Sequence, residues 1–187
     1  MAHVMIVVGS VRPGRIGLPI AEWVRSRVEE AGHAVDFADL KALALPFLDE
    51  PSHPSKRDYQ HAHTRDWSAR VEAADALIFV TPEYNHSYSP ALKNAIDYLY
   101  AEWQAKPVGF VSYGGMSGGS RGVTALELVL SSVGAVKIPT EVNLVAASKQ
   151  LADGAFAADD RQNGGVDALI AQVVAYGEAL RPLQARS

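Results

Sequence analysis

The chain has 187 residues, a formal net charge of −4 at pH 7 and no cysteine. This length favours a single domain, residues 1–187, with a substantial hydrophobic core. The negative charge argues against a nucleic-acid surface, and the lack of cysteine excludes disulfides, thiolate nucleophiles and cysteine-ligated metal centres. Residues 1–8 lack a basic leader, and no apolar run approaches the roughly 18 residues of a membrane span. We therefore expect a cytoplasmic protein.

Five short apolar runs alternate with five helix patterns along the chain. The first helix pattern carries one buried stripe, and Gly32 is a typical residue for ending it. Ser89 and Pro90 are typical of a helix start. Two segments, residues 41–63 and 152–165, are irregular. The predicted strands are 4–8, 34–38, 76–80, 108–112 and a fifth made of 136–138 and 142–145, which Pro139 interrupts. The predicted helices are 16–30, 56–73, 90–104, 120–133 and 166–180.

Alternating strands and helices indicate a parallel sheet with helices on both faces. The element count fits a doubly wound sheet of strand order 2-1-3-4-5, in which ligands bind where the loops after the first and third strands meet. The loop after the fourth strand would lie beside them. These three loops are the most distinctive segments of the chain.

The first loop, residues 9–17, reads GSVRPGRIG. It combines flexible glycine backbone, a hydroxyl, two arginines and the start of a helix, which is the mixture that phosphate recognition requires. Its glycine spacing fits neither a Walker A loop nor the dinucleotide fingerprint GxGxxG. An ordinary strand-to-helix turn with solvent-facing arginines is the alternative.

The second loop and the helix after it, residues 81–97, read TPEYNHSYSPALKNAID. The loop places rigid backbone at Pro82 and a flat aromatic ring at Tyr84 at the mouth of the expected crevice. The third loop, residues 112–121, reads SYGGMSGGSR. Its four glycines allow backbone to approach a ligand closely, and it ends at a helix N-terminus. The alternatives are a surface turn for the second loop and a merely flexible third loop.

Together these loops resemble those of the NADPH-dependent FMN reductases, a family of flavodoxin-like quinone, azo-dye and chromate reductases. The resemblance implies a flavodoxin-like three-layer sandwich with a five-stranded parallel sheet of order 2-1-3-4-5. It also implies a flavin site. The residues implied are Ser10, Arg12, Arg15, Ile16 and Gly17 at the FMN phosphate, Pro82, Glu83, Tyr84 and Asn85 against the isoalloxazine with Ser87 nearby, and Ser112, Gly114, Gly115 and Ser117 at the pyrimidine edge.

The implied function is an FMN-dependent NAD(P)H oxidoreductase. NADPH would reduce the flavin and leave, and a quinone-like or other small electrophile would then take two electrons in a ping-pong cycle. Because FMN carries this chemistry, no catalytic side chain is required. A flavodoxin-type electron carrier and a flavin redox sensor acting through a protein partner stay open as alternatives.

Two further features bear on metals and partners. His61 and His63 sit two residues apart, so on a helix they would point away from each other, which argues against a metal site. The helix carrying Ile96, Leu99, Tyr100 and Trp103 is apolar on one face, which favours core packing but leaves a subunit interface open. The family resemblance implies a homodimer or homotetramer.

Overall fold

The computed structural model describes residues 1–184, so the last three residues of the predicted domain lie outside it. Its centre is a parallel sheet of order β2-β1-β3-β4-β5. This confirms the predicted flavodoxin-like fold class and strand order. The strands are β1 (His3–Val8), β2 (Ala34–Asp39), β3 (Ala76–Pro82), β4 (Pro107–Gly114) and β5 (Val136–Val145).

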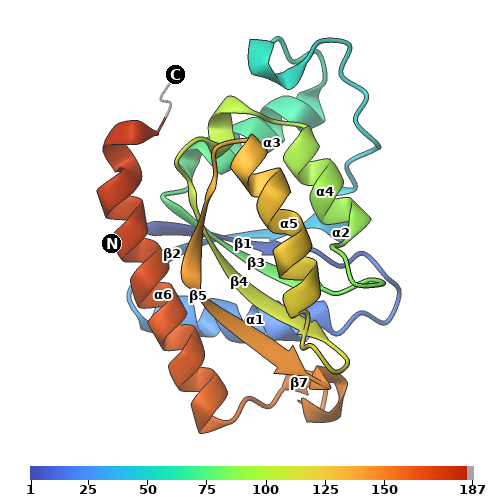
Figure 1. Cartoon of the computed structure of the whole chain (residues 1–187), viewed down its shortest axis with the longest axis vertical. Coiled ribbons are helices and arrows are strands. Elements are labelled where there is room, and N and C mark those ends of the chain that lie inside the picture. The colour runs from blue at the N-terminus through green and yellow to red at the C-terminus, as the bar shows by residue number, and fades with distance from the viewer. Residues whose placement is uncertain (185–187) are drawn as a thin grey trace.

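Helices cover both faces of the sheet, which makes three layers (Figure 1). Side chains alternate along β1, so that Ile6 packs beneath one helical layer and Met5 beneath the other. The first layer consists of α1 (Gly17–Glu30) and α6 (Asp160–Leu180), and the second of α3 (Ala62–Ala73), α4 (Pro90–Asp97) and α5 (Ser120–Ser132), with the short α2 (Leu40–Leu43) after β2.

The fourth helix is shorter than predicted. It ends at Asp97 instead of Gln104, and a separate 3-10 turn, η2 (Ala101–Trp103), follows. Two indole N–H groups donate hydrogen bonds to backbone carbonyls near the end of α4. Trp67 Nε1 donates to Ala95 O at 2.8 Å, and Trp103 Nε1 donates to Ile96 O at 3.0 Å. These bonds satisfy carbonyls that a continuing helix would otherwise use, and they draw both rings into the core.

The last helix is longer than predicted. It starts at Asp160 instead of Val166, because Asp159 and Gln162 form a capping box. Gly164 and Gly165 therefore lie within the first turns of the helix. Residues 151–156 form a small hairpin of β6 (Leu151–Ala152) and β7 (Ala155–Phe156), turning at Asp153 and Gly154, both with positive φ.

The fifth strand is irregular at Pro139, as predicted, but it does not end there. Its register with β4 shifts between Val108 and Phe110, which leaves residues 138–140 outside the regular pairing, and β5 continues through this bulge. One other predicted boundary was wrong. The helix predicted from residue 56 starts at Ala62, since residues 54–56 form a 3-10 turn, η1 (Pro54–Lys56), that ends at the left-handed Arg57. Two further 3-10 turns, η3 (Ala147–Gln150) and η4 (Arg181–Leu183), complete the described chain.

A buried lysine lies at the amino ends of the strands. Lys106, 4% exposed, precedes β4, and its Nζ donates to Glu72 O at 2.9 Å and to Ala74 O. Nearby, the fully buried carboxylate of Glu102 accepts from Tyr59 Oη and Ser68 Oγ. This edge is opposite the one that carries the three loops.

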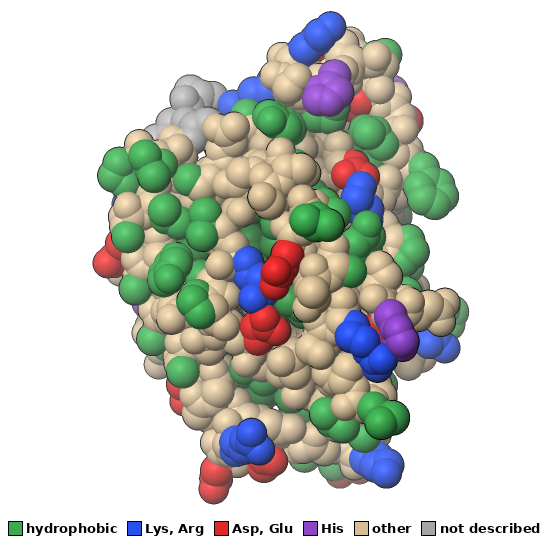
Figure 2. All heavy atoms as spheres, viewed as in Figure 1, with side chains coloured by type: hydrophobic (Ala, Val, Ile, Leu, Met, Phe, Trp, Pro, Cys, Tyr) green, Lys and Arg blue, Asp and Glu red, His purple; other side chains and the backbone are tan. Residues whose placement is uncertain are grey.

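Charged side chains of both signs are interspersed on the face shown in Figure 2. Among residues 1–184, no helix is long and apolar enough to cross a membrane.

Candidate functional site

The first and second loops are joined directly at the carboxyl edge of the sheet. Gly9 N donates to Val80 O at 2.9 Å, and Ser89 Oγ donates to Gly9 O at 2.5 Å. Ser89 is the N-cap residue of α4, as predicted, but its hydroxyl makes no cap hydrogen bond and links the two loops instead. The start of α4 therefore holds the first loop in place.

Ser10 and two tyrosines converge above this junction. Ser10 is 2% exposed, and its Oγ lies 3.2 Å from Tyr84 Oη. Tyr113, on β4, points its hydroxyl at the first turn of α1, where a Cβ added to Gly17 would lie 2.3 Å from Tyr113 Oη. Only glycine at position 17 leaves room for this approach.

The Tyr113 hydroxyl is buried and makes no hydrogen bond of normal geometry to the described residues, although Ser10 lies near it. Burial raises the pKa of Tyr113 above its ordinary value, a shift that the neighbouring Ser10 only partly offsets, so the hydroxyl is protonated and able to donate. A buried donor without a partner costs free energy unless a ligand supplies the acceptor. An anion at the N-terminus of α1 would do so.

The two arginines of the first loop differ in their surroundings. The guanidinium of Arg15 grips both oxygens of Asp39 at 2.6 and 2.5 Å and donates to Ser10 O at 2.6 Å. Burial by itself would raise the pKa of Asp39, but the hydrogen bonds from Arg15 and Lys41 N lower it overall. Arg12, by contrast, is exposed. Arg15 shapes the loop, whereas Arg12 is available to a ligand.

The second loop is a tight two-residue turn. Tyr84 N donates to Ser87 O and Ser87 N donates to Tyr84 O, both at 2.9 Å. Asn85 and His86 between them have φ of 49° and 65°. Asparagine and histidine adopt this left-handed geometry more readily than most residues, and residues held in it concentrate at functional loops.

A chain of polar contacts ties the second loop to the third. Ser117 Oγ donates to Glu83 Oε2 at 2.6 Å, and Arg121 Nε lies 3.0 Å from Glu83 Oε1. Arg121 Nη1 also lies 2.7 Å from His86 Nε2. Burial would raise the pKa of Glu83, but its bonds to Ser117 and Arg121 lower it overall, so it is ionised.

The third loop is folded back onto the sheet. The fully buried Ser112 donates from Oγ to Asn143 Oδ1 at 2.6 Å and lies 2.9 Å from Gly118 O. A Cβ on Gly114 would lie 3.0 Å from Gly119 N, whereas Gly115 faces open space. A side chain at position 114 would crowd Gly119, so glycine there lets the third loop fold back on itself.

The structure brings predicted residues of all three loops together at the carboxyl edge of the sheet. Ser10 contacts Tyr84, and Glu83 of the second loop binds Ser117 of the third loop. The side chains of Arg15, Glu83, Ser112 and Ser117 already have protein partners, so their direct ligand contacts stay predictions. Sequence reasoning missed Tyr113, Asp39, Ser89 and Arg121, since only the strand register and loop packing bring them here.

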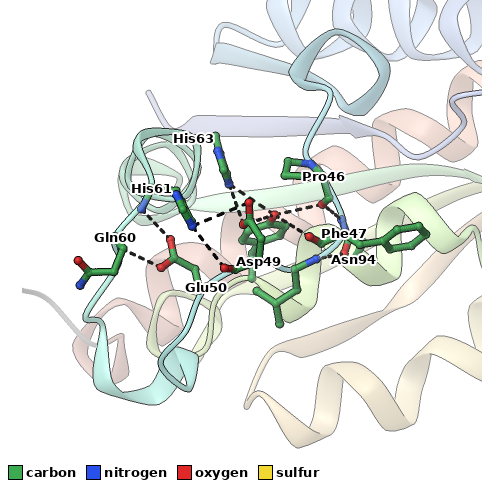
Figure 3. A network of polar contacts seen from close by, with 10 residues as sticks. Pro46, Phe47, Asp49, Glu50, Gln60, His61, His63 and Asn94 are labelled. Carbon is green, nitrogen blue, oxygen red and sulfur yellow. Dashed lines mark hydrogen bonds and ion pairs between the residues drawn. The ribbon is translucent and has the colours of Figure 1, made fainter.

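The prediction that His61 and His63 point apart was wrong. His61 is the N-cap residue before α3, not part of the helix, and the two rings stack with centroids 5.2 Å apart. Both face Asp49, with His63 Nε2 3.1 Å and His61 Nε2 3.9 Å from its carboxylate (Figure 3). Within residues 1–184, no three metal-binding side chains are grouped closely enough to hold an ion.

The aromatic helix considered as an interface is part of the core. Ile96, Leu99 and Trp103 are each at most 1% exposed within this chain, whereas Tyr100 is only partly buried. The three buried side chains offer a second subunit no surface, so a subunit interface at this segment stays a prediction that would have to use Tyr100.

Known proteins resemble this chain in sequence and in fold. Residues 2–149 match the family model of the NADPH-dependent FMN reductases. The NAD(P)H-dependent FMN reductase LOT6 of Saccharomyces cerevisiae is 40% identical over 153 residues, covering 72% of this chain and 80% of that protein. An FMN-dependent NADPH-azoreductase of Staphylococcus haemolyticus is 29% identical over 160 residues, covering 84% and 85%.

Among solved structures, the flavoenzyme NAD(P)H:(acceptor) oxidoreductase FerB of Paracoccus denitrificans superposes with a TM-score of 0.76 at 24% identity, covering 96% of this chain and 98% of FerB. That similarity concerns the fold. The family model and the yeast relative go further: this chain belongs to the NADPH-dependent FMN reductase family and is an oxidoreductase whose cofactors are FMN and NAD(P)H.

Proposed function

We propose that the chain catalyses a ping-pong reaction in which NADPH and a small electrophilic acceptor, such as a quinone, bind in turn at the crevice formed by the three loops. The observation that carries the proposal is the unpartnered Tyr113 hydroxyl beside the N-terminus of α1. This hydroxyl is a donor suited to the FMN phosphate. The second loop nearby offers the flat ring of Tyr84, and the third loop offers glycine backbone at Gly114 and Gly115. FMN, when bound, supplies the hydride chemistry.

In this proposal the residues of the chain bind and orient. Ser10, Tyr113, Arg12 and the first backbone N–H groups of α1 hold the phosphate, while Arg15 holds the loop in shape through Asp39. The turn at Asn85 presents Tyr84 and backbone amides to the ring system, and the Glu83–Arg121 pair keeps that turn against the third loop. A quinone or azo acceptor fits because such molecules are flat and reduced by two electrons.

Three further parts of the proposal rest on the composition and on family resemblance. Residues 1–187 form one domain, the chain assembles into a homodimer or homotetramer, and the protein works in the cytoplasm.

The test is an anaerobic titration of FMN-reconstituted protein with NADPH, followed by the visible absorbance of the flavin. We expect bleaching at about one equivalent and recovery of colour when a naphthoquinone is added. A flavin that binds but stays oxidised would favour the electron carrier or redox sensor. Failure to hold FMN at all would overturn the assignment of the loops.

A further inference from the structure

A groove of about 440 Å³ lies beside the first loop, which contributes Val11 to its lining. Its walls are mostly apolar, as is typical of small-molecule sites of this size. Lys41 is the one charged residue among those that line it within residues 1–184. The lining comprises Val11 of the first loop, Leu40, Lys41, Ala44 and Leu45 of α2 and its end, Pro46 and Phe47, and Pro90, Ala91 and Asn94 of α4.

One end of the groove adjoins the flavin loops. Val11 follows Ser10 directly, and Pro90 follows Ser89, whose hydroxyl binds Gly9 O. A ligand that reaches the flavin at one end can therefore extend into the groove at the other.

The outer wall is held in a fixed position. Asn94 Nδ2 donates to Pro46 O at 2.7 Å, Asn94 Oδ1 accepts from Leu48 N at 3.0 Å, and Tyr98 Oη donates to Pro46 O at 3.1 Å. Tyr98 Oη also donates to Asp49 Oδ1 at 3.0 Å, which anchors the next residues of the same segment. Asp49 faces His63 as well (Figure 3). Preformed walls reduce the entropy lost on binding.

Two side chains that line the groove, Phe47 and Lys41, are exposed. The ring of Phe47 is 84% exposed although its backbone is pinned. Lys41 is exposed, and no acidic group among residues 1–184 pairs with its ammonium, since both oxygens of the nearby Asp39 are taken by Arg15. The groove thus offers a stacking surface and a free cation.

We propose that this groove binds the adenosine 2′-phosphate end of NADPH, with Phe47 against the adenine and Lys41 on the 2′-phosphate. The inference rests on the proposed function, which puts the nicotinamide at the flavin loops. NADPH is elongated, and its far end carries a flat aromatic base and an anionic group, which match the two unused side chains. The same site would distinguish NADPH from NADH, which lacks that phosphate.

Steady-state kinetics of Lys41→Gln with both nucleotides test the assignment. We expect kcat/KM for NADPH to fall about five- to tenfold while the value for NADH stays the same. Lys56→Gln, which removes an exposed lysine from η1 outside the groove, is the matched control and should change neither value. Equal losses for both nucleotides in Lys41→Gln, or no loss for either, would overturn the proposal.

Binding of nucleotide fragments gives a readout that does not depend on turnover. Calorimetry on FMN-loaded protein should show tighter binding of 2′,5′-ADP than of 5′-ADP, and Lys41→Gln should abolish the difference. Equal affinity of the wild type for the two fragments would refute the site. If NADPH fails to reduce the flavin but the Lys41-dependent discrimination is present, the proposed function fails and the nucleotide site stands.

Phe47→Ala should weaken NADPH and NADH alike, because both carry adenine. Its effect also distinguishes a second copy of this chain as the occupant. If the variant changes the oligomeric state in light scattering and leaves both nucleotides unaffected, the groove is a subunit contact and the nucleotide assignment is wrong.

Discussion

Removing the hydroxyl of Tyr113 should affect FMN binding but not the stability of the fold. Its buried Oη makes no hydrogen bond of normal geometry to the described residues. Tyr113→Phe should therefore leave the free energy of unfolding of the FMN-free protein within about 0.5 kcal/mol, yet weaken FMN by about 1–3 kcal/mol. Chemical denaturation and a fluorescence titration with FMN measure the two effects. Tyr176→Phe, on α6, is the control, and unchanged FMN affinity in Tyr113→Phe would remove this hydroxyl from the phosphate site.

Arg15 poses the question of direct or indirect action. The side chains of Arg15 and Asp39 are 9% and 17% exposed, so breaking the pair should cost about 1–3 kcal/mol of folding free energy. We expect Arg15→Ala to weaken FMN binding by about 1–3 kcal/mol, because the first loop then loses the shape in which Ser10 and Arg12 hold the phosphate. Asp39→Asn weakens the same pair but keeps the guanidinium, so it should lower the FMN affinity by a similar factor. A much larger loss in Arg15→Ala than in Asp39→Asn would contradict the indirect role and show that the guanidinium itself contacts the phosphate.

Of these residues, only Arg15 could be predicted from the sequence as a site residue. The motifs at 9–17, 81–97 and 112–121 predicted where the three loops lie along the chain, but neither Tyr113 nor the pairing of Asp39 with Arg15 followed from them. Asp39 reaches Arg15 because it is paired with Val8 at the carboxyl end of β1, and Tyr113 lies beside Pro82 in the β3–β4 register. Register depends on how the strands pair across long separations, which local patterns do not encode.

Neither a close contact nor a positive φ requires glycine at position 164 of α6. Gly164 lies within the helix, and a Cβ added there would contact nothing within 4 Å. Gly164→Ala should therefore raise the free energy of unfolding by about 0.5–1 kcal/mol, measured by urea denaturation. Gly32→Ala is the matched control with equally open space, but its φ of 81° predicts destabilisation. A loss of stability in Gly164→Ala would contradict the helix start at Asp160.

The elements that the sequence predicted well are those with one dominant signal. The apolar runs of β1 and β3 and the capped stripe of α1 fall within two residues of their predicted bounds. The errors arose where two signals competed. Gly164 and Gly165 indicated a loop, but the Asp159–Gln162 capping box prevails, and an apolar pattern up to Gln104 indicated helix, but the indoles of Trp67 and Trp103 end it at Asp97.

For the whole molecule, three hydrogen-bonded carboxyl groups predict how stability depends on pH. The pKa values of Asp39, Asp49 and Glu83 are lowered, because their hydrogen bonds outweigh the effect of burial. A carboxyl group with a lowered folded pKa contributes stability above its unfolded pKa, about 4, and loses it as the pH falls through the folded value. Urea denaturation between pH 6 and about 3 should show this decline. Asp39→Asn should make the decline shallower, and an unchanged slope in that variant would exclude the Arg15–Asp39 pair as a contributor.

The buried lysine beneath β4 has a consequence for how this protein can be altered. Lys106 and Glu102 secure the amino edge of the sheet, while every segment assigned to ligands leaves from the carboxyl edge. Mutagenesis libraries confined to residues 11–14 and 41–48 would then diversify nucleotide preference while most members still fold. Libraries that include Lys106 would instead lose members to misfolding before selection could act. Substitutions at the carboxyl edge of the sheet can therefore change ligand preference, whereas substitutions at the amino edge mainly change whether the protein folds.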